Sequence, residues 1–286
     1  MRRILLLSLF SVLGLAQDAP VGIVTMTQGD AKMTQPGAKN PMQVEIADVL
    51  PVNSRITTTK GKVSFVSCVQ SIAGQIQPDS DVLFTAAGYD VKKGSVAQVH
   101  KIPSCHVPVT NVGGPNAHLG GVNMRGGETT MQLLSPVGTA VDPAQVSFRW
   151  QPVEGATLYR VALRDSSGND LWEYEVKAPT TSLAYSGEKK LSPGASYRWR
   201  VTALQGDEVL SSASAKMDVF SAEDLAHITT TRKQSVDPAE SHLLLGMLYE
   251  ELNAPELALA EYQKVQASTK SKWLGEKISG LKPKSK

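Results

Sequence analysis

The chain has 286 residues, of which 41% are hydrophobic and 20% are charged, a composition typical of a soluble globular protein of one to three domains. It contains 29 Lys and Arg residues against 27 Asp and Glu residues. So balanced a chain has no general attraction for phosphate backbones or anionic lipids, and we expect no nucleic-acid partner.

The first segment, residues 1–16, reads MRRILLLSLFSVLGLA and predicts a signal peptide. Two arginines precede an apolar run, and Gly14 and Ala16 stand where a signal peptidase requires small residues. The run has about 12 residues, fewer than the roughly 20 that a membrane-spanning helix needs; an uncleaved anchor is the alternative. Cleavage after Ala16 predicts a periplasmic or secreted protein without an integral membrane segment.

Residues 17–112 are predicted to form a β unit. The segments GIVTMTQGDAKMT, SRITTTKGKVSFVSCV and GQIQPDSDVLFTAAGYDVKKGSVAQVHKI alternate in hydrophobicity and are broken by Gly and Asp, which is the pattern of many short strands. QGDA and TKGK are hairpin-turn sequences. The alternation places Val63, Phe65, Val82 and Phe84 in the core.

Cys68 and Cys105 are the two cysteines of the chain, and both lie in this unit. In an oxidising compartment we predict that they form a disulfide. The alternative is a metal site completed by His100 and His106, but the spacing lacks the paired ligands of zinc sites, so we predict no metal. Two free buried thiols are the third interpretation.

The same unit resembles the FecR-type domain family. The resemblance rests on GDAKM (29–33), LPVNSRITT (50–58), KVSFVS (62–67), IQPDSDV (76–82) and KKGSVAQV (92–99). The chain departs from the family in QSIAGQ (70–75), which replaces an Asp-Gly-Ser turn, and in its cysteine pair. The resemblance implies an envelope domain used for signal transfer or binding. We do not extend it to sigma-factor control, because we find no counterpart of the membrane helix and anti-sigma segment of the best-known members.

Residues 113–130 are predicted to be a glycine-rich linker, because GGPNAHLGGVNMRGG has no sustained periodicity. No phosphate-binding Gly-Lys-Ser/Thr sequence follows it. Residues 131–220 then show aromatic and aliphatic residues in alternation, with SSGND and SPGAS as turns. This spacing is typical of a β-sandwich.

Residues 131–220 resemble the fibronectin type III family. Trp150 stands where the second strand carries a core tryptophan, and LSPGASYRWRV resembles the entry to the sixth strand, with Trp199 in the core. The resemblance implies a tyrosine corner in which the Tyr197 hydroxyl bonds to the backbone near Leu191, in a spacer or protein-binding module. Trp172 and Tyr174 are either an exposed pair for carbohydrate or protein contact or, as we favour, one core and one edge residue.

Residues 221–286 are predicted to be a helical segment with a basic tail. Asp237 and Glu240 fit a capping box, with Pro238 at the first helical position. Pro255 begins a second helix, and SKWLGEKISGL (271–281) fits a third. A short helix over 222–228 is expected to precede them.

The first two of these three helices resemble one tetratricopeptide (TPR) unit. Gly246, Tyr249, Ala258 and Tyr262 occupy the spacing of that repeat, whereas Val265 and His242 depart from it. Small residues at Gly246 and Ala258 imply a close approach of the two helices. Arrays normally need three or more repeats, so the apolar face is either covered within the chain or left for a partner.

We therefore predict a mainly β chain with a C-terminal α segment. No local signature of a catalytic triad or of a metalloprotease is present, so we expect no enzymatic activity, no catalytic residues and no cofactor; paired carboxylates for glycoside cleavage stay open. The leading hypothesis is an exported envelope adaptor that binds envelope proteins. The alternative is a glycan-binding protein that acts through the FecR-like unit.

Overall fold

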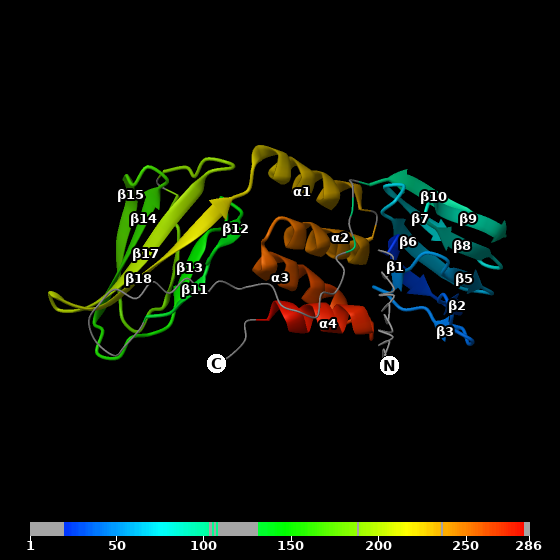
Figure 1. Cartoon of the computed structure of the whole chain (residues 1–286), viewed down its shortest axis with the longest axis horizontal. Coiled ribbons are helices and arrows are strands. Elements are labelled where there is room, and N and C mark those ends of the chain that lie inside the picture. Colours follow the sequence, from blue (N-terminus) through cyan, green and yellow to red (C-terminus); the bar gives the residue numbers. More distant parts are fainter. Residues whose placement is uncertain are drawn as a thin grey trace, which may run out of the picture.

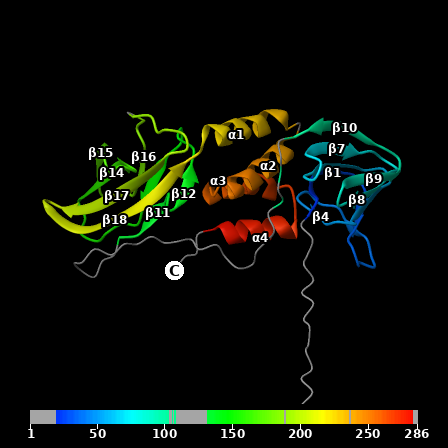
Figure 2. The ribbon, with the colours of Figure 1, turned by 45° about the horizontal axis from the view of Figure 1, so that its top comes forward.

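The computed structural model describes residues 20–102, 105, 107, 131–187, 189–235 and 237–282. These residues form three parts in a row, with four helices between two β units (Figures 1 and 2). The predicted signal peptide and glycine-rich linker lie outside the described residues. Within the described ranges, none of the helices combines the length and hydropathy that crossing a membrane requires.

The first β unit consists of two antiparallel five-stranded sheets, in the orders β10-β7-β6-β1-β4 and β3-β2-β5-β8-β9. Val63, Phe65, Val82 and Phe84 are fully buried, as predicted, and the rings of Phe65 and Phe84 meet edge to face with centroids 5.0 Å apart. The strands are β1 (Gly22–Gln28), β2 (Ala31–Thr34), β3 (Met42–Gln43), β4 (Val49–Leu50), β5 (Arg55–Thr58), β6 (Lys62–Ser67), β7 (Ile72–Ile76), β8 (Asp81–Thr85), β9 (Gly88–Lys93) and β10 (Val96–Lys101).

Two hairpin turns of this unit lie against each other. The β1–β2 turn contains Gly29, with φ +76°, and the β5–β6 turn contains Gly61. A Cβ atom on Gly61 would lie 2.6 Å from the carbonyl oxygen of Asp30, closer than any side-chain carbon approaches an oxygen. Glycine in both turn sequences is therefore explained by backbone packing.

The second β unit is a sandwich of a three-stranded sheet, β11-β13-β16, and a five-stranded sheet, β12-β18-β17-β14-β15. Trp150 and Trp199 lie in its core, and the Tyr197 hydroxyl accepts a 2.8 Å hydrogen bond from the Ser192 N–H, as in a tyrosine corner. The β-sandwich implied by the fibronectin type III resemblance is confirmed. Its strands are β11 (Leu133–Ser135), β12 (Thr139–Val141), β13 (Ser147–Trp150), β14 (Leu158–Asp165), β15 (Asp170–Lys177), β16 (Ser182–Ala184), β17 (Ser196–Gln205) and β18 (Glu208–Val219).

Three of the four helices begin at a capping side chain, whereas the one that begins at Pro255 has none. Ser221 and Asp224 form a capping box that the sequence analysis did not identify, and Asp237 accepts a 2.7 Å hydrogen bond from the N–H of Ala239. Glu240 was expected to complete a capping box with Asp237. Its Oε1 lies 3.4 Å from Nε2 of His100 in β10. The first helix is longer than the predicted 222–228. The helices are α1 (Ala222–Gln234), α2 (Pro238–Glu251), α3 (Pro255–Gln266) and α4 (Lys272–Leu281).

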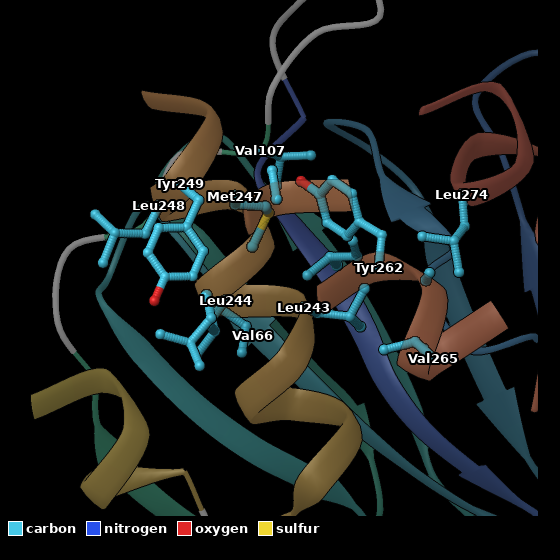
Figure 3. Close-up of a cluster of buried hydrophobic side chains, with 14 of the residues drawn as sticks. Val66, Val107, Leu243, Leu244, Met247, Leu248, Tyr249, Tyr262, Val265 and Leu274 are labelled. Atoms are coloured by element: carbon cyan, nitrogen blue, oxygen red, sulfur yellow. The ribbon is translucent and has the colours of Figure 1, made fainter. Parts of the chain in front are cut away.

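One side of the first β unit shares a hydrophobic core with the helices, whereas the two sheets of that unit enclose a second core and the sandwich has a third. Figure 3 shows Val66 of β6 and Val107 beside side chains of α2, α3 and α4. The buried members from the first unit and the segment after it are Ile23, Ala47, Val66, Ala73, Ile102 and Val107. The sandwich is therefore inserted, in sequence, between two segments that pack as one body.

Candidate interaction surfaces

Helices α2 and α3 approach each other closely at Gly246. A Cβ atom on Gly246 would lie 2.4 Å from Cε1 of Tyr262, so the absence of a side chain lets the tyrosine ring lie against α2. Tyr262 and Ala258 are fully buried, and Tyr249 is 4% exposed. The core residues predicted for this hairpin thus all lie inside the protein.

A polar network ties the three C-terminal helices together. The Tyr262 hydroxyl donates a 2.6 Å hydrogen bond to Glu250 Oε1, and Lys277 Nζ donates a 2.9 Å bond to Glu250 Oε2. Burial and the Glu250 carboxylate raise the pKa of Tyr262 well above its ordinary value. Trp273 meets the Tyr262 ring edge to face at 5.8 Å. The polar and aromatic side chains on the inner face of this bundle therefore have their partners on its own helices.

The turn between α3 and α4 docks on a loop of the first β unit, residues 45–48. Thr269 Oγ1 donates a 2.7 Å hydrogen bond to the carbonyl oxygen of Ile46, and Ser271 Oγ donates a 3.1 Å bond to that of Ala47. These bonds satisfy loop carbonyls that would otherwise be buried without partners. The helices are therefore fixed to this unit by hydrogen bonds as well as by the shared core.

Asp48 in the same loop has a perturbed acidity. Burial raises the pKa of Asp48 from 3.8 to about 6; a backbone hydrogen bond from Glu45 lowers it, and the Glu45 charge raises it. The Glu45 N–H donates to Asp48 Oδ2 at 2.8 Å. The loop that receives the helices thus contains a carboxyl group that titrates near neutral pH.

The sandwich contacts the other end of the helices through polar groups. Asn253, between α2 and α3, donates a 2.9 Å hydrogen bond from Nδ2 to the Gly138 carbonyl and accepts one of 2.9 Å from the Ala140 N–H. At the junction of β18 and α1, the buried Phe220 ring stacks on Tyr249 with centroids 6.0 Å apart. Phe220 is therefore anchored in the shared core while its backbone continues the sandwich.

Glu256, in the first turn of α3, reaches across a cleft to the sandwich. Its carboxylate accepts hydrogen bonds from Ser135 Oγ at 2.8 Å and from Arg149 at 2.5 Å. Arg149 and Glu256 are each about half exposed, so this ion pair contributes at most about 1 kcal/mol. The cleft has mixed polar and apolar walls, including Gln145, Ser147 and Leu257.

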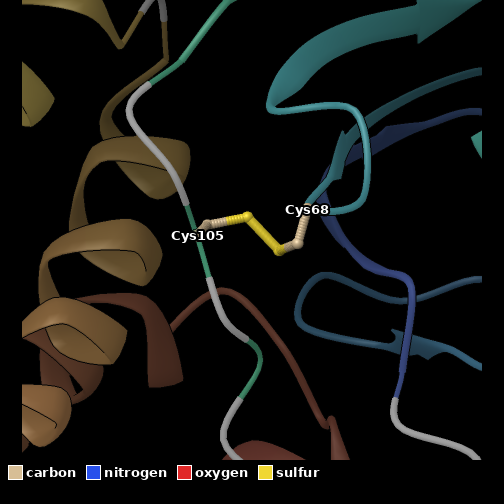
Figure 4. The surroundings of a disulfide bond; sticks show 2 residues. All are labelled: Cys68 and Cys105. Carbon is tan, nitrogen blue, oxygen red and sulfur yellow. A yellow bond between two sulfur atoms is a disulfide. The ribbon is translucent and has the colours of Figure 1, made fainter.

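A disulfide joins Cys68 and Cys105, with a Cα–Cα distance of 4.9 Å (Figure 4). Cys68 follows β6, and Cys105, which follows β10 in the sequence, lies on the side of the helices. Both sulfurs are in the bond, so neither the metal site nor the free thiols considered above apply. His100 points instead at a helix carboxylate, and His106 lies outside the described residues.

Large exposed apolar side chains among the described residues occur only in the two β units. Trp172 is 5% exposed and Tyr174 is 49% exposed, and the two rings stack 6.0 Å apart, which matches the core-and-edge interpretation. Helices α1 to α4 contribute none. The exposed set is Met42, Val69, Val91, Val99, Leu134, Tyr174 and Val209.

The contacts that fix the helices between the β units were not identified from the sequence. Residues 45–48 and Glu256 carry no local signal of a contact, because their partners are up to 225 positions away. Asn253 follows α2 with a φ of +56°, a left-handed conformation that asparagine adopts at the ends of helices. No group of three or more His, Cys, Asp or Glu side chains in the described part of the chain could hold a metal ion.

Comparisons with known proteins find similarity only among solved structures. No protein-family model matches the chain, and no curated protein matches it. A fibronectin type III domain of human collagen α-1(XX) has 20% identity and a TM-score of 0.24, over 35% of this chain and 88% of that one. A two-domain fibronectin type III segment of chicken tenascin has 14% identity and a TM-score of 0.25, over 66% of this chain and 82% of that one. Because these TM-scores are low, the description of residues 131–220 as a β-sandwich with a tyrosine corner rests on the structure itself.

Proposed function

We propose that this chain is an exported, non-enzymatic interaction protein that presents two β units at a spacing set by four helices. One observation carries the proposal: the large exposed apolar side chains of the described residues lie on the β units, while the apolar faces of the helices are buried. Exposed apolar side chains mark sites of protein contact where they gather into a patch. Envelope proteins are the proposed partners, bound on the outer surfaces of the β units.

The proposal includes two finer assignments, a FecR-type domain for residues 17–112 and one TPR-like hairpin for α2 and α3. In support of the first, the Gly-Asp motif falls in the turn between β1 and β2, and the Pro-Asp-Ser motif falls between β7 and β8. The close approach at Gly246, with Ala258 fully buried, supports the second.

Export is part of the same proposal. The disulfide between Cys68 and Cys105 supports it, because such bonds persist in oxidising compartments and are rare in the cytosol. The predicted signal peptide is consistent with it. An N-terminal sequence of the purified native protein that begins at Gln17 would verify the cleavage.

Site-directed photo-crosslinking in native cells tests the use of the β units. A photoreactive residue is placed at Val91 or Val209, on the two β units, and at the exposed helix positions Gln263 and Lys233 as matched controls. We expect adducts with specific envelope proteins from the β positions and none from the helix positions. Adducts from the helix positions alone would contradict the proposal, as would turnover of a glycan or peptide by the purified chain.

Glycan binding by the first β unit is the second candidate. Four of the exposed apolar residues lie on this unit, at Met42, Val69, Val91 and Val99. Sedimentation of the purified chain with isolated cell-wall material distinguishes the two functions. Retention that is lost on substituting Val91 and Val99 with Ser would favour the glycan, whereas a chain that stays in the supernatant would exclude it.

A further inference from the structure

The outer face of the five-stranded sheet of the sandwich carries a row of cations. Its middle strand is β17 (Figure 1). In the register of the sheet, Arg198 on β17 lies directly opposite Arg164 on β14 and directly opposite Lys216 on β18. All three side chains are exposed. Because neighbouring strands lie about 4.8 Å apart, the row spans about 10 Å of the surface.

Such a row is unfavourable for the chain on its own. Like charges directly opposite each other on neighbouring strands destabilise a sheet, whereas opposite charges stabilise it. The strands cannot slip to separate the cations, because the alternate residues Tyr197, Trp199 and Val201 are buried in the sandwich core and fix the register. The stability of the sheet therefore does not account for the row.

The edge strand β15 supplies carboxylates to the cations of β14. Arg160 Nη2 lies 2.9 Å from Glu175 Oε1, and Arg164 Nε lies 2.5 Å from Asp170 Oδ1. Glu173, between these two carboxylates along β15, has its Oε1 3.6 Å from Arg160 Nε. One border of this outer face is therefore lined with carboxylates.

Arg198 and Arg200, both on the middle strand, have no such partners. On β18, Lys216 Nζ lies 3.1 Å from Asp218 Oδ1, which places a carboxylate at the opposite border of the face. Within the parts of the chain that the structure describes, neither guanidinium of β17 takes part in an ion pair or a side-chain hydrogen bond. The centre of the face thus has two adjacent cations without counter-charges.

The surroundings of these two arginines leave them accessible. Arg200 lies directly opposite Ala162 on β14 and Ser214 on β18, whose side chains are too short to cover a guanidinium. Since Arg198 and Arg200 are two residues apart on one strand, their side chains leave the same face about 7 Å apart. Carboxylates on alternate residues of an extended peptide have this same spacing, and each can accept two parallel hydrogen bonds from a guanidinium.

We propose that this outer face binds an acidic segment of a protein partner, whose carboxylates pair with Arg198 and Arg200. The charge pattern favours a protein over a uniform polyanion such as a sulfated polysaccharide, because a polyanion would bring negative charge against the carboxylates at both borders. A protein segment combines central carboxylates with neutral or basic flanks. This binding role rests on the proposed function, in which the outer surfaces of the β units contact envelope proteins.

Titration of the purified full chain with a defined acidic peptide tests this role. The probe is Thr-Glu-Thr-Glu-Thr with blocked ends, and the matched control is Thr-Gln-Thr-Gln-Thr. NMR of the chain labelled with nitrogen-15 in arginine follows the side-chain Nε–Hε signals. We expect the signals of Arg198 and Arg200 to shift saturably with the acidic peptide at low salt, and not with the control. Added salt should weaken the binding, because exposed charges are screened.

Substitutions on the same face separate the two arginines from their neighbours. The double variant Arg198→Gln, Arg200→Gln should bind the acidic peptide about tenfold more weakly, the effect of losing two exposed ion pairs. Its urea midpoint should be no lower than that of the native chain, because the row of like charges is relieved. Arg160→Gln is the matched control, since Arg160 already pairs with Glu175, and it should bind as the native chain does.

Several results would overturn this role for Arg198 and Arg200. They are the absence of a saturable shift at the two arginines, equal shifts with the control peptide, and undiminished binding by the double variant. Tighter binding of dextran sulfate than of the peptide, per negative charge and through the same arginines, would also do so, because the ligand would then be a polyanion. Adducts from Val91 or Val209 in cells, without peptide binding in the titration, would reject this site and leave the proposed function in place.

Discussion

Gly246 is the residue at which the packing of α2 on α3 is tightest. An alanine Cβ would overlap the Tyr262 ring, with 2.4 Å to Cε1, and the fully buried ring has no room to move away. We predict that Gly246→Ala lowers the free energy of unfolding by about 1–3 kcal/mol, despite the higher helix propensity of alanine. Urea denaturation followed by circular dichroism measures the change.

Gly280 in α4 is the matched control, because a Cβ atom there would meet nothing within 4 Å. Gly280→Ala should raise the free energy of unfolding by about 0.5–1 kcal/mol, the ordinary difference in helix propensity. Stabilisation of similar size at both glycines would show that α2 and α3 do not approach as described.

Asp48 gives the stability of the protein a dependence on pH. Burial raises the pKa of Asp48 to about 6, so the folded state binds a proton more tightly than the unfolded chain. The contribution of this group to the free energy of unfolding therefore rises as pH falls from 7 to 4. Asp48→Asn keeps an acceptor for the Glu45 N–H without the buried charge. We predict that it stabilises the protein by about 1–2 kcal/mol at pH 7.5, after allowance for partial exposure, and by much less at pH 4.5.

Urea denaturation of the native chain and Asp48→Asn at the two pH values measures this effect. The Thr269 hydroxyl bonds to the backbone carbonyl of the neighbouring Ile46 and not to the Asp48 side chain, so the comparison isolates the carboxyl group. A variant less stable than the native chain at pH 7.5, or a difference that does not depend on pH, would refute the prediction.

At the scale of elements, the disulfide holds the segment after β10 to the end of β6. Cys68 and Cys105 are 37 positions apart, and a cross-link closing a loop of that length restricts the unfolded chain by about 3–4 kcal/mol. We predict that the Cys68→Ala, Cys105→Ala double variant loses about 2–4 kcal/mol of stability in urea denaturation. The same loss should appear when the native chain is reduced.

The double variant itself should not respond to reductant, which separates the effect of the bond from that of the solvent. An unchanged stability on removal of the bond would mean that Ile102 and Val107, buried in the shared core, already fix this segment. In that case the disulfide would have no structural role at the boundary between the first β unit and the helices.

Local patterns in the sequence predict many of the elements but not how they meet. Alternation places Phe65 and Phe84 in a core correctly, and helical spacing with Pro255 predicts the hairpin. The length of α1 escapes detection because only Ile228 and Thr231 are buried on it, so it has little apolar periodicity. The His100–Glu240 pair also escapes, because nothing local marks two residues that meet through folding.

At the scale of the whole molecule, the distribution of the three hydrophobic cores predicts different behaviour for the two β units. The sandwich, residues 131–220, has a separate core, and we predict that it folds when expressed alone, with a cooperative thermal transition. Residues 17–112 expressed alone keep the core between their two sheets, but they should bind a hydrophobic dye and aggregate, because Val66, Ala73 and Ile102 lose the helices that cover them. A stable, monomeric 17–112 fragment would contradict the shared core.

The central claim is that the helices are fixed between the β units by contacts within the chain. Native-state hydrogen exchange of the monomeric full chain at increasing urea tests it most directly. The account predicts that the slowest amides of α2 and α3 open with the same free energy and urea dependence as those of β1 and β6, while β14 and β17 open as a separate unit. Helices that exchange far more readily than β1 and β6, and become protected only when a partner is added, would contradict it.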